Sequence, residues 1–170
     1  RVVALENVFD RSIKTGSLDD VRQLRRILQT EGESGQQAWK ELQGATVRHI
    51  QDQAFGGATR DVRGNPVVSA AALESTVASL DKSGKLDFIF GKKGAEQIRL
   101  INDVAKDVAT APPGAVNTSN TAGVLLAAMD MALSGSAGMP LPVMSGLRML
   151  VKNVKDRKLR ARIQHALGKK

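Results

Sequence analysis

One stretch, residues 88–120, constrains the fold more than any other part of the chain. It opens with a glycine-bounded basic turn from Gly91 to Gly94, after which apolar residues recur at steps of three and four, the spacing of one helix face. These residues are Ile98, Ile101, Ala105 and Val108, with Leu100 and Val104 widening the stripe. Pro112 and Pro113 cannot continue a helix. The sequence therefore predicts a strong, central helix that begins after Gly94 and ends before Pro112.

Helical spacing recurs through most of the chain, and no segment shows the sustained alternation of a half-buried strand. We expect further helices over residues 2–14, 17–31, 34–55, 69–82, 121–133, 143–154 and 157–167, a polar loop over 58–68 and a short apolar connector over 86–90. The predicted fold is all-α: one compact globular bundle of about seven or eight short-to-medium helices, spanning residues 1–170 as a single domain.

Capping residues and apolar stripes define the expected helices more closely. Ser17, Ser34 and Ser69 each precede a helical pattern and can cap it. Gly32 is expected to end the helix that Ser17 starts, with Arg22, Arg25 and Arg26 on its outer side. The expected buried residues are Phe9, Ile13, Val21, Leu24, Ile27, Leu28, Trp39, Leu42, Thr46, Ile50, Ala54, Leu73, Val77, Leu80, Phe88 and Phe90.

Several classes of protein are disfavoured by what the sequence lacks. There is no cysteine, so disulfides, thiolate metal sites and a cysteine nucleophile are excluded. No apolar run reaches the roughly 18 residues that a membrane span needs. The chain begins at Arg1 without Met or a signal-peptide pattern, and we expect it to be a fragment of a longer polypeptide. We predict neither a cofactor nor a metal site.

The net charge of +8 is concentrated at one end of the chain. Residues 148–170 contain nine Lys or Arg and one acid, whereas residues 1–147 contain sixteen of each sign. This basic helical tail is either a solvated helix face or a surface for phosphates, an acidic protein or anionic lipid. The residues predicted to make such contacts are Lys152, Lys155, Arg157, Lys158, Arg160 and Arg162.

Other candidate sites are weaker. Lys92 and Lys93 precede a helix and could hold an anion, although the spacing of a phosphate-binding loop is incomplete. His49 and His165 lack neighbouring ligand residues, so helical positions without a catalytic or metal-binding role are the better interpretation. The apolar helix expected over 121–133 and the methionines between 129 and 149 belong either to the core or to an interface with other copies or chains.

Five runs of sequence resemble a known class of protein: FDRSIKTGSLDDVRQLRR, GNPVVSAAALE, LDKSGKLDFIFGKKGAEQIRLINDVAKDV, ATAPPGAVNTSNTA and KDRKLRARI. They are similar to the C-terminal region of large internal virion, or DNA-ejection, proteins of tailed bacteriophages and prophages. The resemblance covers nearly the whole chain but includes no catalytic signature, because the enzymatic parts of such proteins lie elsewhere in the polypeptide.

The resemblance implies a helical structural module that sits inside the capsid or near the portal and passes into the host envelope at infection. Its expected partners are other virion proteins, such as portal or ejection proteins. Non-specific DNA contact, transient membrane contact and homo-oligomerisation are also expected, in the virion and, during assembly, in the host cytoplasm.

Three functions follow as expectations. The first is a non-enzymatic virion module that assembles with other virion proteins and helps DNA leave the capsid. The second is a nucleic-acid-binding domain without sequence preference that acts through residues 152–162. The third is a hydrolytic enzyme, which would need a deep polar pocket with an acidic residue beside His49.

Overall fold

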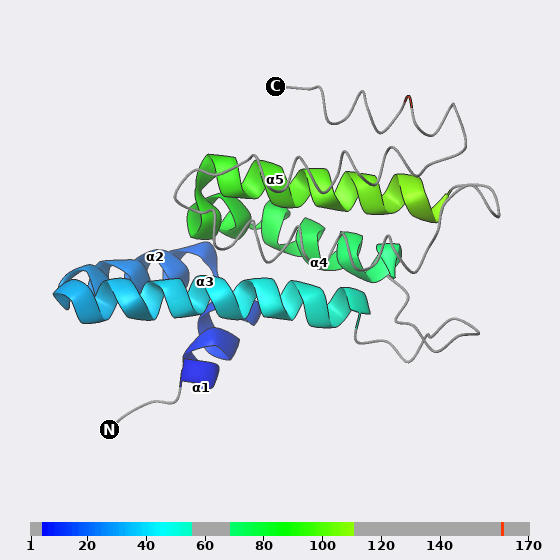
Figure 1. The fold of residues 1–170 in the computed structure, drawn as a ribbon. Coiled ribbons are helices and arrows are strands. Elements are labelled where there is room, and N and C mark those ends of the chain that lie inside the picture. The colour runs from blue at the N-terminus through cyan, green and yellow to red at the C-terminus, as the bar shows by residue number, and fades with distance from the viewer. Residues whose placement is uncertain (1–4, 56–68, 111–160, 162–170) are drawn as a thin grey trace.

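The structure is a computed structural model that describes residues 5–55, 69–110 and 161 (Figure 1). All regular structure in these residues is helical, which confirms the predicted all-α class. The elements are α1 (Leu5–Phe9), the π-helical turn η1 (Asp10–Lys14), α2 (Leu18–Gln29), α3 (Gly32–Phe55), α4 (Ala70–Lys82) and α5 (Lys85–Ala109). The loop expected over 58–68 and the three helices expected after Pro113 lie outside the described residues.

Helix α3 runs through the middle of this body. Figure 1 shows α4 and α5 side by side along one side of α3 and α1 on the other, and α2 packs against α3 directly. The predicted buried face of α3 is confirmed at every position: Trp39, Leu42, Thr46, Ile50 and Ala54 are all buried. The Thr46 hydroxyl donates to the Leu42 carbonyl oxygen at 2.8 Å, so the one polar side chain on this face is satisfied.

Helix α2 begins with the cap that the sequence predicts. The Ser17 hydroxyl accepts a hydrogen bond from the Asp20 amide at 3.2 Å, and the Asp20 carboxylate accepts one from the Ser17 amide at 2.7 Å. This reciprocal pair is a capping box, and the Ser17 backbone amide, followed by its hydroxyl, lowers the pKa of Asp20. The box therefore fixes where α2 starts.

The junction between α2 and α3 corrects two predictions. Helix α3 begins at Gly32, so Ser34 lies within its first turn and does not cap it. The two helices approach so closely that a Cβ on Gly35 would lie 1.7 Å from the Leu28 carbonyl oxygen, which only glycine allows. Ile27 is 54% exposed, because it lies six residues after buried Val21 and points well away from that face.

Helices α4 and α5 form the most extensive helix pair of the described body. The Ser69 hydroxyl caps α4 as predicted, accepting from the Ala72 amide at 3.2 Å. The buried residues of the pair are Leu73, Val77 and Leu80 on α4, and Ile98, Ile101, Val104 and Ala105 on α5. Helix α5 ends at Ala109, before the two prolines, as the sequence predicts.

The start of α5 differs from the prediction. Residues 86–90, expected as a connector, are helical and belong to the first segment of α5, residues 85–90; residues 92–109 form the second. Gly91 breaks the helix between these two segments. Its backbone angles, φ 72° and ψ 170°, lie in a region that is essentially restricted to glycine. The predicted basic turn is therefore wrong beyond Gly91, because Lys92, Lys93 and Gly94 are already helical.

Polar contacts hold the two segments of α5 in place. Arg99 donates to Asp81 of α4 at 2.7 Å and to Asp87 of the first segment at 2.8 Å, bridging the break at Gly91. Hydrogen bonds from Arg99 lower the pKa of Asp81. Buried Lys85 donates to the Ile13 carbonyl oxygen at 2.8 Å and thereby ties α5 to the end of η1.

The core gives a test of the fold. Ile101→Ala removes a fully buried side chain and should lower the free energy of unfolding by about 2–5 kcal/mol. Ile27→Ala removes the same atoms from an exposed position and should change it by no more than about 0.5 kcal/mol. Urea unfolding followed by the fluorescence of Trp39, the chain's one tryptophan, measures both. Equal losses in the two variants would contradict the fold.

Candidate functional site

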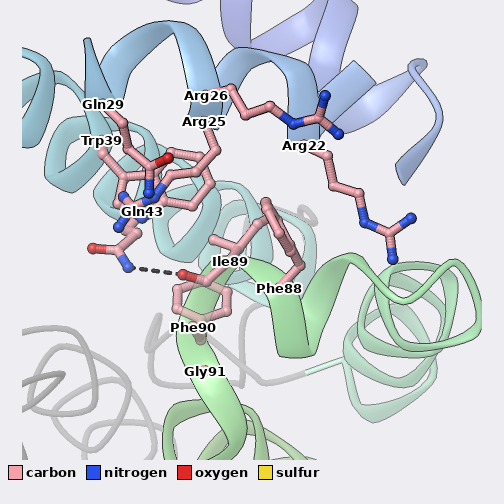
Figure 2. Close-up of a pocket in the computed structure, with 10 residues that line it drawn as sticks. All are labelled: Arg22, Arg25, Arg26, Gln29, Trp39, Gln43, Phe88, Ile89, Phe90 and Gly91. Carbon is pink, nitrogen blue, oxygen red and sulfur yellow. Dashed lines mark hydrogen bonds between the residues drawn. The ribbon is translucent and has the colours of Figure 1, made fainter. Parts of the chain in front are cut away.

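A surface hollow of about 540 Å³ lies where α2, α3 and the first segment of α5 meet (Figure 2). Three helices supply its lining, and we refer to it as the arginine hollow. The lining residues are Arg22, Arg25, Arg26, Gln29, Trp39, Gln43, Phe88, Ile89, Phe90 and Gly91. It combines cationic side chains with aromatic ones, a combination that suits binding.

The basic side of the hollow comes from helical spacing in α2. Arg22, Arg25 and Arg26 are three and four residues apart, so they share one helix face, as Figure 2 shows. Arg22 forms an exposed ion pair with Asp19 at 3.0 Å. Neither Arg25 nor Arg26 forms an ion pair with any residue in the described ranges. Two guanidinium groups at this surface thus keep their capacity to bind an anion.

The aromatic side of the hollow comes from α3 and α5. The Arg25 guanidinium carbon lies 4.4 Å from the centre of the Trp39 ring, a cation–π contact. Trp39 meets Phe88 edge to face, with ring centres 6.0 Å apart and an interplanar angle of 83°. Burial lowers the pKa of Arg25, because the cation is partly desolvated by this packing. Arg25 is therefore held in a defined position over an aromatic surface.

The break at Gly91 brings α5 into the hollow. A continuous helix would direct the Ile89 carbonyl to the amide four residues later. At the break, Ile89 instead accepts a hydrogen bond at 2.7 Å from the Gln43 side chain of α3 (Figure 2). Phe88, predicted to fill the core, is only half-buried and lines the hollow, whereas Phe90 is buried as expected. The break thus presents a backbone turn and aromatic side chains to α2.

The chemistry of the lining favours binding over a reaction. The side chains that line the hollow are arginine, glutamine, aromatic and aliphatic, and these described residues include no carboxylate, histidine or hydroxyl group. Such a set provides hydrogen-bond donors for anions and apolar surface beside them. General acid–base and nucleophilic catalysis draw on other groups.

His49, the basis of the hydrolase hypothesis, lies elsewhere. Its ring meets Phe9 edge to face at 5.8 Å, and burial together with Lys14 lowers its pKa. It does not line the arginine hollow. Across residues 5–55 and 69–110, no group of three or more His, Asp or Glu is arranged to hold a metal, and no helix is long and apolar enough to cross a membrane.

The other predicted site residues are separated from the hollow or lie outside the described ranges. Lys92 and Lys93 are exposed immediately after Gly91 and do not belong to its lining. The contact residues predicted in the basic tail, Lys152, Lys155, Arg157, Lys158, Arg160 and Arg162, lie outside the described residues, as does His165.

No family model, curated protein or solved structure matches this chain. Its function therefore has to be inferred from its own residues and their geometry.

The sequence pattern alone did not identify the hollow. It placed the three arginines on the outer side of a helix, which holds for exposed Arg22 and Arg26 but not for half-buried Arg25, and it gave no sign of the aromatic residues beside them. The signal that could have marked them was three cations on one face without an acid at the positions between.

The stacking of Arg25 gives a second test. Trp39 is 5% exposed, and Arg25→Ala removes the guanidinium that covers it. We expect a red-shifted emission and faster acrylamide quenching of this single tryptophan. Arg26→Ala is the matched control, because it deletes another lining arginine that makes no contact with the ring among the described interactions. Unchanged emission in the Arg25 variant would show that the stack does not form.

Proposed function

We propose that this chain is a non-enzymatic helical module of a tailed-bacteriophage virion protein, which assembles with other virion proteins and takes part in DNA ejection. The observation that carries the proposal is the arginine hollow. Its two guanidinium groups without ion pairs among the described residues, beside half-buried Phe88, form a surface suited to contact with another macromolecule. Portal and ejection proteins are the proposed partners.

The virion part of the proposal is supported by the placement of the resembling runs. Two of the five runs cover residues 9–26 and 80–108. These segments build α2 and α5, and they supply the three arginines together with Phe88, Phe90 and Gly91. The two longest runs of the resemblance thus contain most of the residues that line the hollow.

The remaining features of the proposal concern the whole chain. The bundle would reach seven or eight helices through those predicted after Pro113, and the basic tail would face phosphates or acidic portal subunits. The proposed location is the virion, and the host cytoplasm during assembly, with transient membrane contact and self-association as accompanying properties.

The test is to look for the chain in phage particles. Particles induced from the source organism and purified on a density gradient should contain peptides of residues 5–110 by mass spectrometry. Those peptides should resist protease while the capsid is full and become cleavable once DNA release is triggered. Particles that lack the peptides would contradict the virion assignment, and empty, tailless particles from the same gradient serve as the control.

The concentration of charge at the C-terminus favours a second candidate, DNA binding without sequence preference. If the six predicted tail cations neutralise phosphates, a plot of log K against log salt for duplex DNA should have a slope of about −5. A variant with glutamine at Lys152, Lys155, Arg157, Lys158, Arg160 and Arg162 should then lose most of that slope. Binding that is absent or independent of salt would reject this function.

A further inference from the structure

We infer that the arginine hollow docks an acidic peptide segment of another protein, with carboxylates on the arginines of α2 and an apolar side chain against half-buried Phe88. The inference deepens the proposed contact function and rests on it, because it names the chemistry of the partner. Four observations support it: the arrangement of the guanidinium groups, the apolar lining at Phe88, the stacking of Arg25 on Trp39 and the charge of the rest of the chain.

The guanidinium groups are arranged to receive more than one carboxylate. Arg22 and Arg26 are four residues apart on α2 and lie about 40° apart around the helix axis, with Arg25 about 60° to the other side of Arg22. Each guanidinium can bind a carboxylate through two parallel hydrogen bonds. Stacking on Trp39 at 4.4 Å orients Arg25 before any ligand arrives, which reduces the entropy lost on binding. A helical or extended peptide with acidic residues at similar spacing matches this row.

The floor of the hollow favours a peptide over a nucleic acid. Half-buried Phe88 supplies exposed apolar surface in a volume of about 540 Å³, which gives room for an aliphatic side chain of the partner. Ile89 and Phe90 also line the hollow but are themselves buried. A single-stranded nucleic acid is typically held by exposed aromatic faces on which its bases stack. Trp39 does not offer one, because it is 5% exposed and Arg25 covers its ring.

The charge of the remaining parts of this chain indicates that the acidic segment belongs to another protein. Residues 56–68 contain two arginines and one aspartate, and residues 111–170 contain nine Lys or Arg against two aspartates. Neither segment can supply a run of carboxylates to this row of arginines, and both would add positive charge beside it. An acidic segment from a different chain complements the hollow where these segments cannot.

The experiment is titration of the purified 170-residue chain with a synthetic helical peptide of Glu, Leu and Ala, followed by Trp39 fluorescence. The peptide should bind and change the emission. Arg26→Glu should weaken binding about tenfold or more, through the loss of one charge-assisted pair and the repulsion that replaces it. Arg48→Glu is the matched control, because it makes the same charge change at an exposed position of α3 outside the lining, and it should leave affinity within about twofold.

Two altered peptides test the arginine contacts and the apolar contact separately. A peptide with Gln in place of every Glu should lose binding through the arginines, and one with Ser in place of every Leu should lose binding to the apolar floor. Oligothymidylate tests the competing ligand class.

The inference is overturned if the Glu peptide does not bind, if Arg26→Glu and Arg48→Glu weaken it equally, or if oligothymidylate displaces it at equal affinity. It is also overturned if the chain self-associates through a contact that Arg26→Glu abolishes while the peptide has no effect. None of these outcomes depends on whether the chain is found in virions, so the docking inference and the virion assignment can fail separately.

Discussion

The buried face of α3 supports the rest of the described body, because α1, α2 and α4 pack on this helix and the first segment of α5 contacts it through Gln43 and Trp39. Burial of a large aliphatic side chain contributes about 1.5–3 kcal/mol, whereas an exposed ion pair contributes at most about 1 kcal/mol. The aliphatic contacts therefore dominate the stability. Pairs such as Lys106–Glu74, at 2.6 Å and largely exposed, help to set how α4 and α5 align.

The break at Gly91 divides α5 into a segment that packs along α4 and a segment that lines the arginine hollow. The second segment of α5 lies along α4, and the first segment turns toward α2 and α3, where Phe88 and the Ile89 carbonyl meet Trp39 and Gln43. Arg99 spans the break through Asp81 and Asp87 and holds this turn in one geometry. A side chain with a Cβ at position 91 would disfavour the backbone conformation on which the hollow depends.

Local patterns in the sequence predicted most of the described helices but not the hollow. Three- and four-residue spacing identified the buried face of α3, and Ser17 and Ser69 marked helix starts, because these signals lie within a few residues of one another. The start of α3 was misplaced because the close approach of Gly35 to Leu28 is a tertiary contact. For the same reason, the pairing of Arg25 with Trp39 could not be predicted from either residue alone.

Lys85 makes the short N-terminal elements indispensable to a helix that begins some seventy residues later in the chain. Lys85 is 5% exposed, with the Ile13 carbonyl as the acceptor of its ammonium group and the charge of Asp20 nearby. A shortened chain starting at Leu18 would lose this acceptor together with the buried side chains of Phe9 and Ile13, and the burial of Ile13 alone contributes about 1.5–3 kcal/mol. The boundary of the folding unit therefore lies upstream of η1, and a lower urea midpoint in the shortened chain would reveal it.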